Sequence, residues 1–182
     1  GGMIITNNKN LDYRIKDLRN LSFGKKNRFN HHDISWNYRF TNIQAALGLS
    51  QLKRINKIVD KKFKIGNFYY DKLKKNKNII IQPSKLKYAK NIYWVFGLVV
   101  KKNYKLSVDK IRKKLLKLNI QTRPFFWPIH MQQAYIKKKI FNNKEKFPIT
   151  EFISKQGFYL PSGLGIRSKE LQHVIKSINT II

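Results

Sequence analysis

The strongest pattern of apolar and polar positions along the chain lies behind Thr41. Thr41 and Gln44 have the spacing of a capping box, in which each side chain bonds the backbone N–H of the other residue. Apolar residues then recur at helical spacing: Ala45, Leu49, Leu52, Ile55, Val59, Phe63 and Phe68. The pattern predicts one long helix from Thr41 to about Leu73, with a kink or break at Gly66.

Weaker patterns predict the remaining elements. Helical spacing indicates further helices at residues 9–21, 108–118, 147–158 and 168–178. Short apolar runs predict strands at residues 3–6, 79–81, 93–100 and 120–122, of which 93–100 is expected to be buried. Segments without a clear period are expected to be loops or turns: residues 22–40, 123–130 and 160–167.

This order of elements predicts an α/β fold. Strand, helix, strand, loop and helix within residues 79–182 fit a small α/β domain with a largely antiparallel sheet. The basic stretch 72–78 and Pro83 mark the expected boundary, so residues 1–78 are assigned to a different domain.

Composition adds a large positive charge to this picture. The 182 residues include 39 Lys and Arg against 9 Asp and Glu, a formal net charge of +30, and no cysteine. The lack of cysteine excludes a disulfide scaffold, a cysteine nucleophile and thiolate zinc sites. The charge has two explanations, a surface that binds polyanions or compositional drift, since lysines are spread along the chain together with many Asn and Ile.

Targeting and nucleic-acid signals are missing from the sequence. We find no signal peptide, no apolar run of membrane-spanning length, and no zinc-finger or RNA-binding motif. A soluble, cytoplasmic protein without a specific nucleic-acid partner is therefore expected.

The first segment with candidate chemistry is residues 35–46. Asn37 and Arg39 alternate there with aromatic side chains directly before the helix start at Thr41. Free N–H groups, the positive end of the helix dipole and a guanidinium together suit an anion. The alternative is that the aromatic residues pack inward while Asn37 and Arg39 merely face water.

The second segment is residues 121–130, which carries Arg123, His130 and three large aromatic residues around two prolines. Aromatic rings beside an arginine can stack a base or sugar and bind a phosphate. The alternative is a packed aromatic loop with a surface arginine and a structural histidine.

Other kinds of catalytic site find little support. The sequence has no paired carboxylates with a plausible partner, no Gly-rich phosphate loop and no Gly-x-Ser-x-Gly elbow. Residues 31–33 read His-His-Asp, but adjacent histidines on one loop rarely face one point, so no metal site is expected.

Four motifs occur in order along the chain. They are Gly1-Gly2-Met3-Ile4-Ile5-Thr6, Trp36-Asn37-Tyr38-Arg39-Phe40-Thr41-Asn42-Ile43-Gln44-Ala45-Ala46-Leu47-Gly48, Thr122-Arg123-Pro124-Phe125-Phe126-Trp127-Pro128-Ile129-His130 and Tyr159-Leu160-Pro161-Ser162-Gly163. Together they resemble the DegT/DnrJ/StrS family of sugar-nucleotide aminotransferases over essentially the whole chain. The Arg-Pro-Phe-Phe form looks most like the perosamine-synthase branch, which aminates a GDP-linked 4-keto-6-deoxy sugar.

The resemblance implies the C-terminal part of a type I aminotransferase fold. Residues 1–78 would end the large domain that binds pyridoxal phosphate, and residues 79–182 would form the small domain. It also implies a homodimer with shared active sites, a nucleotide-diphosphate sugar substrate and an amino-acid donor, usually glutamate. The lysine that holds the cofactor as a Schiff base is expected just before Gly1-Gly2, so no catalytic residue is assigned and the isolated chain is expected to be inactive.

The resemblance to the family also implies roles for four individual residues. Asn37 matches the residue that reaches the cofactor phosphate of the neighbouring subunit, and Arg39 lies beside it. Arg123 and His130 match the loop that lines the sugar-nucleotide site. Three hypotheses follow: a fragment of an aminotransferase, a basic polyanion-binding module that keeps the fold without the chemistry, and the C-terminal half of a split enzyme.

Overall fold

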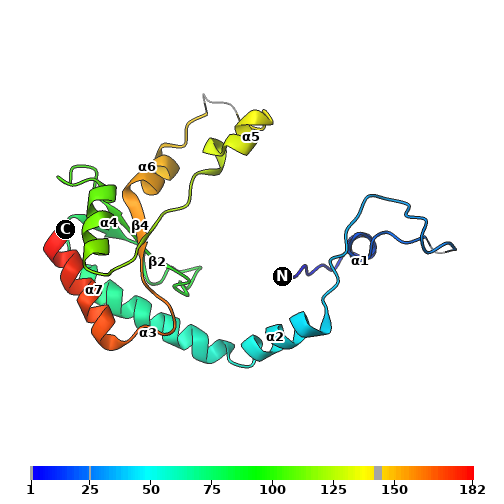
Figure 1. Cartoon of the computed structure of the whole chain (residues 1–182), viewed down its shortest axis with the longest axis horizontal. Coiled ribbons are helices and arrows are strands. Elements are labelled where there is room, and N and C mark those ends of the chain that lie inside the picture. The colour runs from blue at the N-terminus through cyan, green and yellow to red at the C-terminus, as the bar shows by residue number, and fades with distance from the viewer. Residues whose placement is uncertain (1, 25, 142–144) are drawn as a thin grey trace. The chain divides into compact units, whose positions relative to one another are not determined.

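The computed structural model describes residues 2–24, 26–141 and 145–182. The chain separates into two compact units, residues 1–54 (unit 1) and residues 55–182 (unit 2), and Figure 1 labels the helices α1 to α7 and the strands β2 and β4. The domain boundary predicted at residues 78–79 stays a prediction.

Unit 1 contains the helices α1, Lys9–Arg19, and α2, Asn42–Leu52. The predicted capping box at the start of α2 is confirmed. Gln44 N–H donates to Thr41 Oγ1 at 3.2 Å, and Thr41 N–H donates to Gln44 Oε1 at 2.9 Å. Neither helix, each described in full, holds a buried residue, so the apolar side chains of both remain accessible to solvent.

The strand predicted at residues 3–6 is wrong. Among the described residues no strand pairs with this run, and Met3, Ile4 and Ile5 are all exposed. An apolar run becomes a strand only when a neighbouring strand satisfies its backbone groups.

The long helix predicted from Thr41 to Leu73 is divided. The helix α2 ends at Leu52, and α3, Ile55–Leu73, begins after a short turn at residues 53–54. The break considered at Gly66 is absent, because α3 runs through this residue, and the alternative of a kink stays a prediction. Gly66 has a packing role instead, since a Cβ at this position would lie 2.6 Å from Cδ1 of Tyr93 and closer still to other atoms of that ring.

Unit 2 is built on a four-stranded antiparallel sheet in the order β1-β2-β4-β3, within the described residues. The strands are β1, Ile79–Ile81, β2, Phe96–Val100, β3, Arg123–Pro124, and β4, Gly157–Leu160. In register, Val99 faces Ile80 of β1, and Leu98 faces Phe158 of β4. The predicted small α/β domain with an antiparallel sheet is confirmed.

Three helices cover one face of this sheet: α3, α4, Val108–Lys117, and α7, Ser168–Ile181. Alternate strand residues point toward them, and the buried cluster combines residues from all of these elements: Ile65, Tyr69, Leu73, Phe96, Leu98, Val100, Ile111, Leu115, Phe158, Leu160, Leu171, Val174 and Ile178. Figure 1 shows α7 beside α3, which agrees with the contacts between them. This shared burial is the main stabilising contribution to unit 2.

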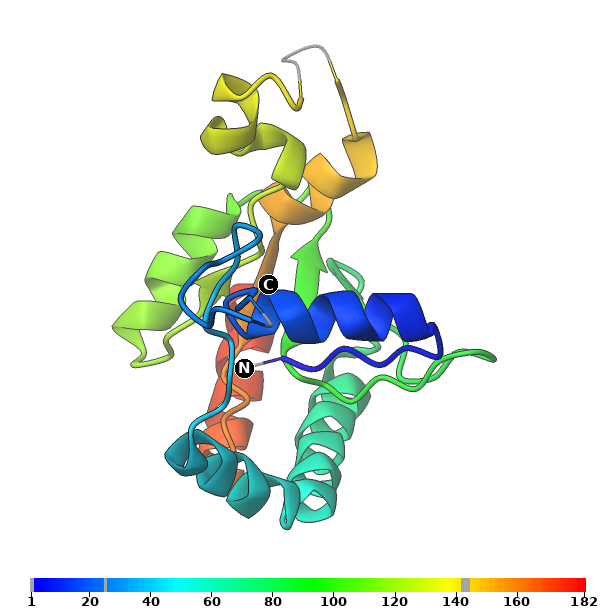
Figure 2. The same cartoon turned by 90° about the vertical axis from the view of Figure 1, so that its right-hand side faces the viewer.

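The segment between β3 and β4 carries three short helices: η1, Ile129–Met131, α5, Gln133–Lys137, and α6, Pro148–Gln156. Figure 2 shows it reaching beyond one end of the strands. Across the described residues, no helix combines the length and apolar character needed to span a membrane.

The strand predictions fail where pairing decides the outcome. The pattern places residues 147–158 in a helix, but α6 ends at Gln156 and β4 begins at Gly157. The strand predicted at 120–122 is displaced to Arg123–Pro124, and the strand predicted at 93–100 begins only at Phe96. Strand boundaries depend on partners distant in the sequence, which a local pattern does not contain.

Candidate functional site

The loop that carries Asn37 and Arg39 is fastened to the end of α1. Trp36 N–H donates to Leu18 O at 3.2 Å, and Tyr38 N–H donates to Arg19 O at 3.0 Å. Both neighbours of Asn37 are therefore anchored through their backbones, and the position of Asn37 is fixed between them.

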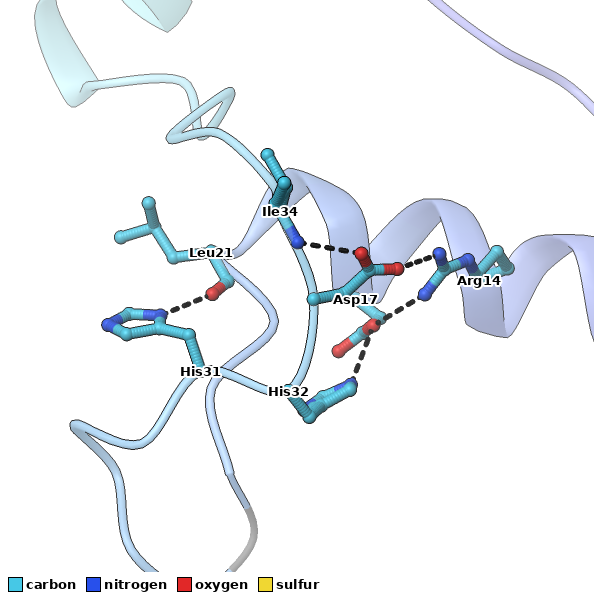
Figure 3. Close-up of polar contacts among 7 residues, drawn as sticks. Arg14, Asp17, Leu21, His31, His32 and Ile34 are labelled. Atoms are coloured by element: carbon cyan, nitrogen blue, oxygen red, sulfur yellow. Dashed lines mark hydrogen bonds and ion pairs between the residues drawn. The ribbon is translucent and has the colours of Figure 1, made fainter.

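A polar cluster holds the same loop further along, as Figure 3 shows. Arg14 pairs with Asp33 and lies 3.4 Å from Asp17, and His32 Nε2 lies 3.0 Å from the same Asp17 carboxylate. The hydrogen bond from Arg14 holds the pKa of Asp33 below its ordinary value. His31 Nδ1 lies 2.6 Å from a backbone carbonyl oxygen of the loop. These contacts fasten the loop to α1. In the part of the chain that is described, no group of three or more His, Cys, Asp or Glu side chains could hold a metal ion.

Asn37 and Arg39 are exposed and bonded to each other. Arg39 Nε donates to Asn37 Oδ1 at 3.0 Å, which leaves the NH2 group of Asn37 without a hydrogen-bond partner among the described residues. The flanking rings of Trp36 and Tyr38 stack with centroids 6.1 Å apart and are 53% and 70% exposed. The alternative in which these aromatic side chains pack inward is therefore wrong for unit 1.

This arrangement fits a phosphate group. The Asn37 amide and the Arg39 guanidinium offer hydrogen-bond donors and a positive charge to solvent, immediately before the first turn of α2. The partial positive charge of a helix N-terminus also favours an anion. These two side chains could hold the phosphate of pyridoxal phosphate.

Arg123 and His130 lie in different surroundings, although both belong to unit 2. Arg123 is exposed on β3, directly opposite Tyr159 of β4. His130 is 7% exposed, its ring lies 4.7 Å from that of Phe147, and its Nε2 lies 3.1 Å from Glu151 Oε1. Arg123 is thus free to meet a ligand, whereas the Nε2 atom of His130 is already engaged.

Glu151 links His130 to the start of α6. Its carboxylate accepts the Phe147 N–H at 2.9 Å as well as contacting His130. The backbone bond from Phe147, followed by the bond to His130, lowers the pKa of Glu151 below its ordinary value. The charged carboxylate therefore holds the buried imidazole in a fixed orientation.

The sequence prediction misses two side chains of unit 2, Trp94 and Lys62. Trp94 falls in a run expected to be buried, yet it is 67% exposed. Lys62 is one lysine among many, and only the structure shows its Nζ 2.9 Å from Trp94 O and 2.7 Å from Ser162 O. Successive side chains in a strand point to opposite faces, so a strand over this run could not bury both Tyr93 and Trp94, but the alternation alone does not say which of the two is exposed.

Comparisons with known proteins cover both segments. The profile of the DegT/DnrJ/EryC1/StrS aminotransferase family matches residues 1–179. The chain is 31% identical over 180 residues to a GDP-perosamine synthase from Escherichia coli O157:H7, and 28% identical over 182 residues to one from Caulobacter vibrioides. These matches cover 98% and 100% of this chain but 46% and 48% of the relatives, so the chain spans about half the length of the curated relatives it matches.

Solved structures share the fold. Helicobacter pylori PseC, an aminotransferase involved in the biosynthesis of pseudoaminic acid, matches with a TM-score of 0.83 at 24% identity, over 97% of this chain and 47% of that one. DesV from S. venezuelae matches with a TM-score of 0.80 at 20% identity, over 97% and 45%. The predicted fold class is therefore confirmed, and so is the predicted cofactor, because the family consists of pyridoxal-phosphate-dependent enzymes. With a profile match that extends over 1–179, the chain belongs to the DegT/DnrJ/EryC1/StrS aminotransferase family.

Proposed function

We propose that this chain forms part of a pyridoxal-phosphate-dependent aminotransferase that acts on a nucleotide-linked keto-sugar. The amino group would come from an amino acid, with glutamate as the first candidate, and the acceptor would be a sugar such as GDP-4-keto-6-deoxymannose. The observation that carries this proposal is the match to GDP-perosamine synthases over the whole chain. It is supported by the exposed Asn37–Arg39 pair at the start of α2.

The residues of this chain would bind and orient rather than perform the covalent chemistry. Bound pyridoxal phosphate supplies the carbonyl group that takes up the amino group and the ring that withdraws electrons. Asn37 would donate a hydrogen bond to the cofactor phosphate, and Arg39 would neutralise its charge. We assign the Schiff-base lysine to none of the lysines in this sequence and propose that a polypeptide segment outside it supplies that residue.

Substrate binding would fall to the second segment. Arg123, exposed on β3, would offset the negative charge of the diphosphate. His130 would border the sugar nucleotide while its Nε2 stays with Glu151, which keeps the imidazole from rotating. Loss of His130 should therefore raise the KM for the keto-sugar and leave cofactor binding unchanged.

We further propose a cytoplasmic homodimer in which Asn37 and Arg39 serve the active site of the partner subunit. This proposal rests on the family resemblance at residues 36–48. It is supported by the exposed apolar faces of α1 and α2, because an apolar helix face is normally covered by another protein surface.

The function can be tested with the natural-length protein, pyridoxal phosphate, glutamate and 4-keto-6-deoxy sugars linked to GDP, UDP or dTDP. Mass spectrometry should detect an amino sugar, with GDP as the preferred carrier. Asn37→Ala should weaken cofactor retention about ten- to a hundred-fold, since a hydrogen bond to a charged group is worth about 1.5–3 kcal/mol. The matched control is Asn10→Ala, at an exposed position on α1, and it should leave cofactor retention unchanged. If no keto-sugar is aminated with any carrier, the proposed function is wrong.

The net charge of +30 favours a second candidate, a basic module that binds polyanions. Binding that arises from dispersed lysines alone should be insensitive to sequence and should collapse as salt rises. A sequence-specific nucleic-acid complex that survives high salt, in a protein without aminotransferase activity, would favour this second candidate.

A further inference from the structure

Three aromatic rings form a row in unit 2 that the core does not use. Trp94 and Phe126 stack with centroids 6.0 Å apart and planes 5° from parallel, and Phe126 lies 6.1 Å from Tyr159. Trp94 is 67% and Phe126 57% exposed. We call these three residues the aromatic ledge. Tyr159 is partly buried and its ring is tilted by 30° from that of Phe126. Large aromatic side chains are normally buried or covered, so a stacked pair that faces solvent points to a ligand.

The backbone beside the ledge is strained in a way that exposes Trp94. Tyr93 has a φ of 51°, in the left-handed region that large side chains rarely adopt. Its ring is buried over Gly66 and stacks on Phe96 with centroids 5.9 Å apart. The left-handed residue therefore directs Tyr93 into the core and leaves Trp94 outside. Strain that persists in a native backbone is often associated with a functional site.

A lysine holds the backbone at Trp94 and the segment that follows Tyr159. Lys62 Nζ donates to Trp94 O at 2.9 Å and to Ser162 O at 2.7 Å, and thereby joins the segment before β2 to the segment after β4. Partial burial of the ammonium lowers the pKa of Lys62 below its ordinary value. Tyr69 adds a bond from its hydroxyl to Pro161 O at 2.7 Å. The backbone at Trp94 and the segment after Tyr159 are consequently held in place before any ligand arrives, which lowers the entropic cost of binding.

A positive charge lies beside the ledge. Arg123 is directly opposite Tyr159 in the β3–β4 pair, and side chains opposite each other in an antiparallel pair lie on the same face. The Phe125 ring packs against Gly97 and Gly157, which offer no side chains there, and a Cβ on Gly97 would lie 2.6 Å from this ring. Flat aromatic rings next to a guanidinium match a ligand that has a planar ring and a negative charge.

We propose that the aromatic ledge stacks the base of a nucleoside diphosphate, with Trp94 as its outer face and Arg123 as the counter-charge for the phosphates. The proposal rests on the proposed function, whose substrate is a nucleotide-linked sugar, and adds the residues that hold the nucleotide. Base–aromatic stacking tolerates different bases, so the ledge supplies affinity, and a larger base should gain more from it.

The test compares GDP with inorganic pyrophosphate, which lacks a base, by calorimetric titration of the natural-length protein. Trp94→Leu should weaken GDP binding about five- to 150-fold, the range for one lost base stack, and leave pyrophosphate binding unchanged. Trp94→Phe, which keeps a ring, should stay near the wild type. Tyr88→Leu is the matched control, because Tyr88 is 87% exposed and its ring has no stacking partner among the described residues. Arg123→Gln should weaken the binding of both GDP and pyrophosphate.

The outcomes separate the two proposals. Equal GDP affinity in wild type and Trp94→Leu, when thermal unfolding curves show that both proteins are folded, overturns the proposal for the aromatic ledge. It leaves the proposed function standing. Weakening by Tyr88→Leu as large as that by Trp94→Leu also overturns the proposal for the aromatic ledge, because the effect would then not be specific to the ledge. GDP binding that depends on Trp94, in an enzyme that aminates no keto-sugar, supports the ledge and contradicts the proposed function. A wild type that binds no nucleoside diphosphate contradicts both.

Discussion

Replacing Gly66 by alanine should destabilise the protein, although the same change stabilises most helices. Gly66 lies inside α3, where alanine is favoured over glycine by about 1 kcal/mol in helix propensity. Here, however, the new Cβ would lie 2.6 Å from Cδ1 of Tyr93 and closer to other ring atoms, well inside van der Waals contact.

The Tyr93 ring has little room to withdraw. It is 1% exposed and stacks on Phe96 at 5.9 Å, and its backbone is already in the left-handed region. Overpacking a core typically costs about 1–3 kcal/mol. Because the clash involves the base of the ring rather than a flexible tip, we expect the upper part of that range, and a net loss of about 2 kcal/mol after the gain in propensity.

Urea unfolding followed by circular dichroism measures this loss. The matched control is Gly48→Ala in α2, where nothing lies within 4 Å of the new Cβ, and this change should stabilise by up to about 1 kcal/mol. Removing the ring provides a second check. In a Tyr93→Ala background, Gly66→Ala should become stabilising, since the atoms that it would strike are gone. If Gly66→Ala is neutral or stabilising in the wild-type background, the packing of Tyr93 over α3 is not as described.

Three further predictions concern caps and polar contacts. Thr41→Ala should cost about 1 kcal/mol and accelerate amide exchange at the start of α2; unchanged exchange would contradict the capping box. Lys62→Met should cost about 1–2 kcal/mol through two lost carbonyl partners, whereas its exposed neighbour Lys61→Met should stay within about 0.5 kcal/mol. The lowered pKa of Glu151 adds stability that is present above the ordinary carboxyl value, about 4.3, and is lost as pH falls through the folded value. Glu151→Gln should therefore be less stable than wild type at neutral pH, and the difference should shrink below about pH 4; a gap that does not change with pH would show that the charge of Glu151 is irrelevant.

Local signals explain which elements could be predicted from the sequence. The capping box needs only Thr41 and Gln44, three positions apart, and both of its hydrogen bonds are present. The helix α4 follows from its apolar spacing and from the cap at Ser107, whose Oγ accepts the Lys110 N–H at 3.4 Å. Residues that interact within one helical turn are also close in the sequence, so a local sequence pattern is sufficient to predict their contacts.

Long-range pairing explains what the sequence pattern does not show. The strand β4 exists because Gly157 to Leu160 fit between β2 and β3, which are distant in the chain. The role of Gly66 depends on a ring 27 residues away, and no helical periodicity contains that information.

The residues of the candidate site also differ in whether the sequence alone could identify them. Asn37 and Arg39 could be identified from a contiguous motif, and the structure leaves both exposed beside a helix start. Trp94 could not, because its exposure follows from the left-handed conformation of Tyr93. The predicted roles of Arg123 and His130 stay predictions.

Mixing two inactive variants tests the central claim most directly, that Asn37 completes the cofactor site of a partner subunit. One variant is Asn37→Ala and the other lacks the Schiff-base lysine, both in the enzyme that includes the segment supplying that lysine. If sites are shared, each mixed dimer contains one site with both lesions and one site with neither, so aminotransferase activity should reappear on mixing. If proven mixed dimers remain inactive, Asn37 serves its own subunit or a structural role, and the proposed shared site is contradicted.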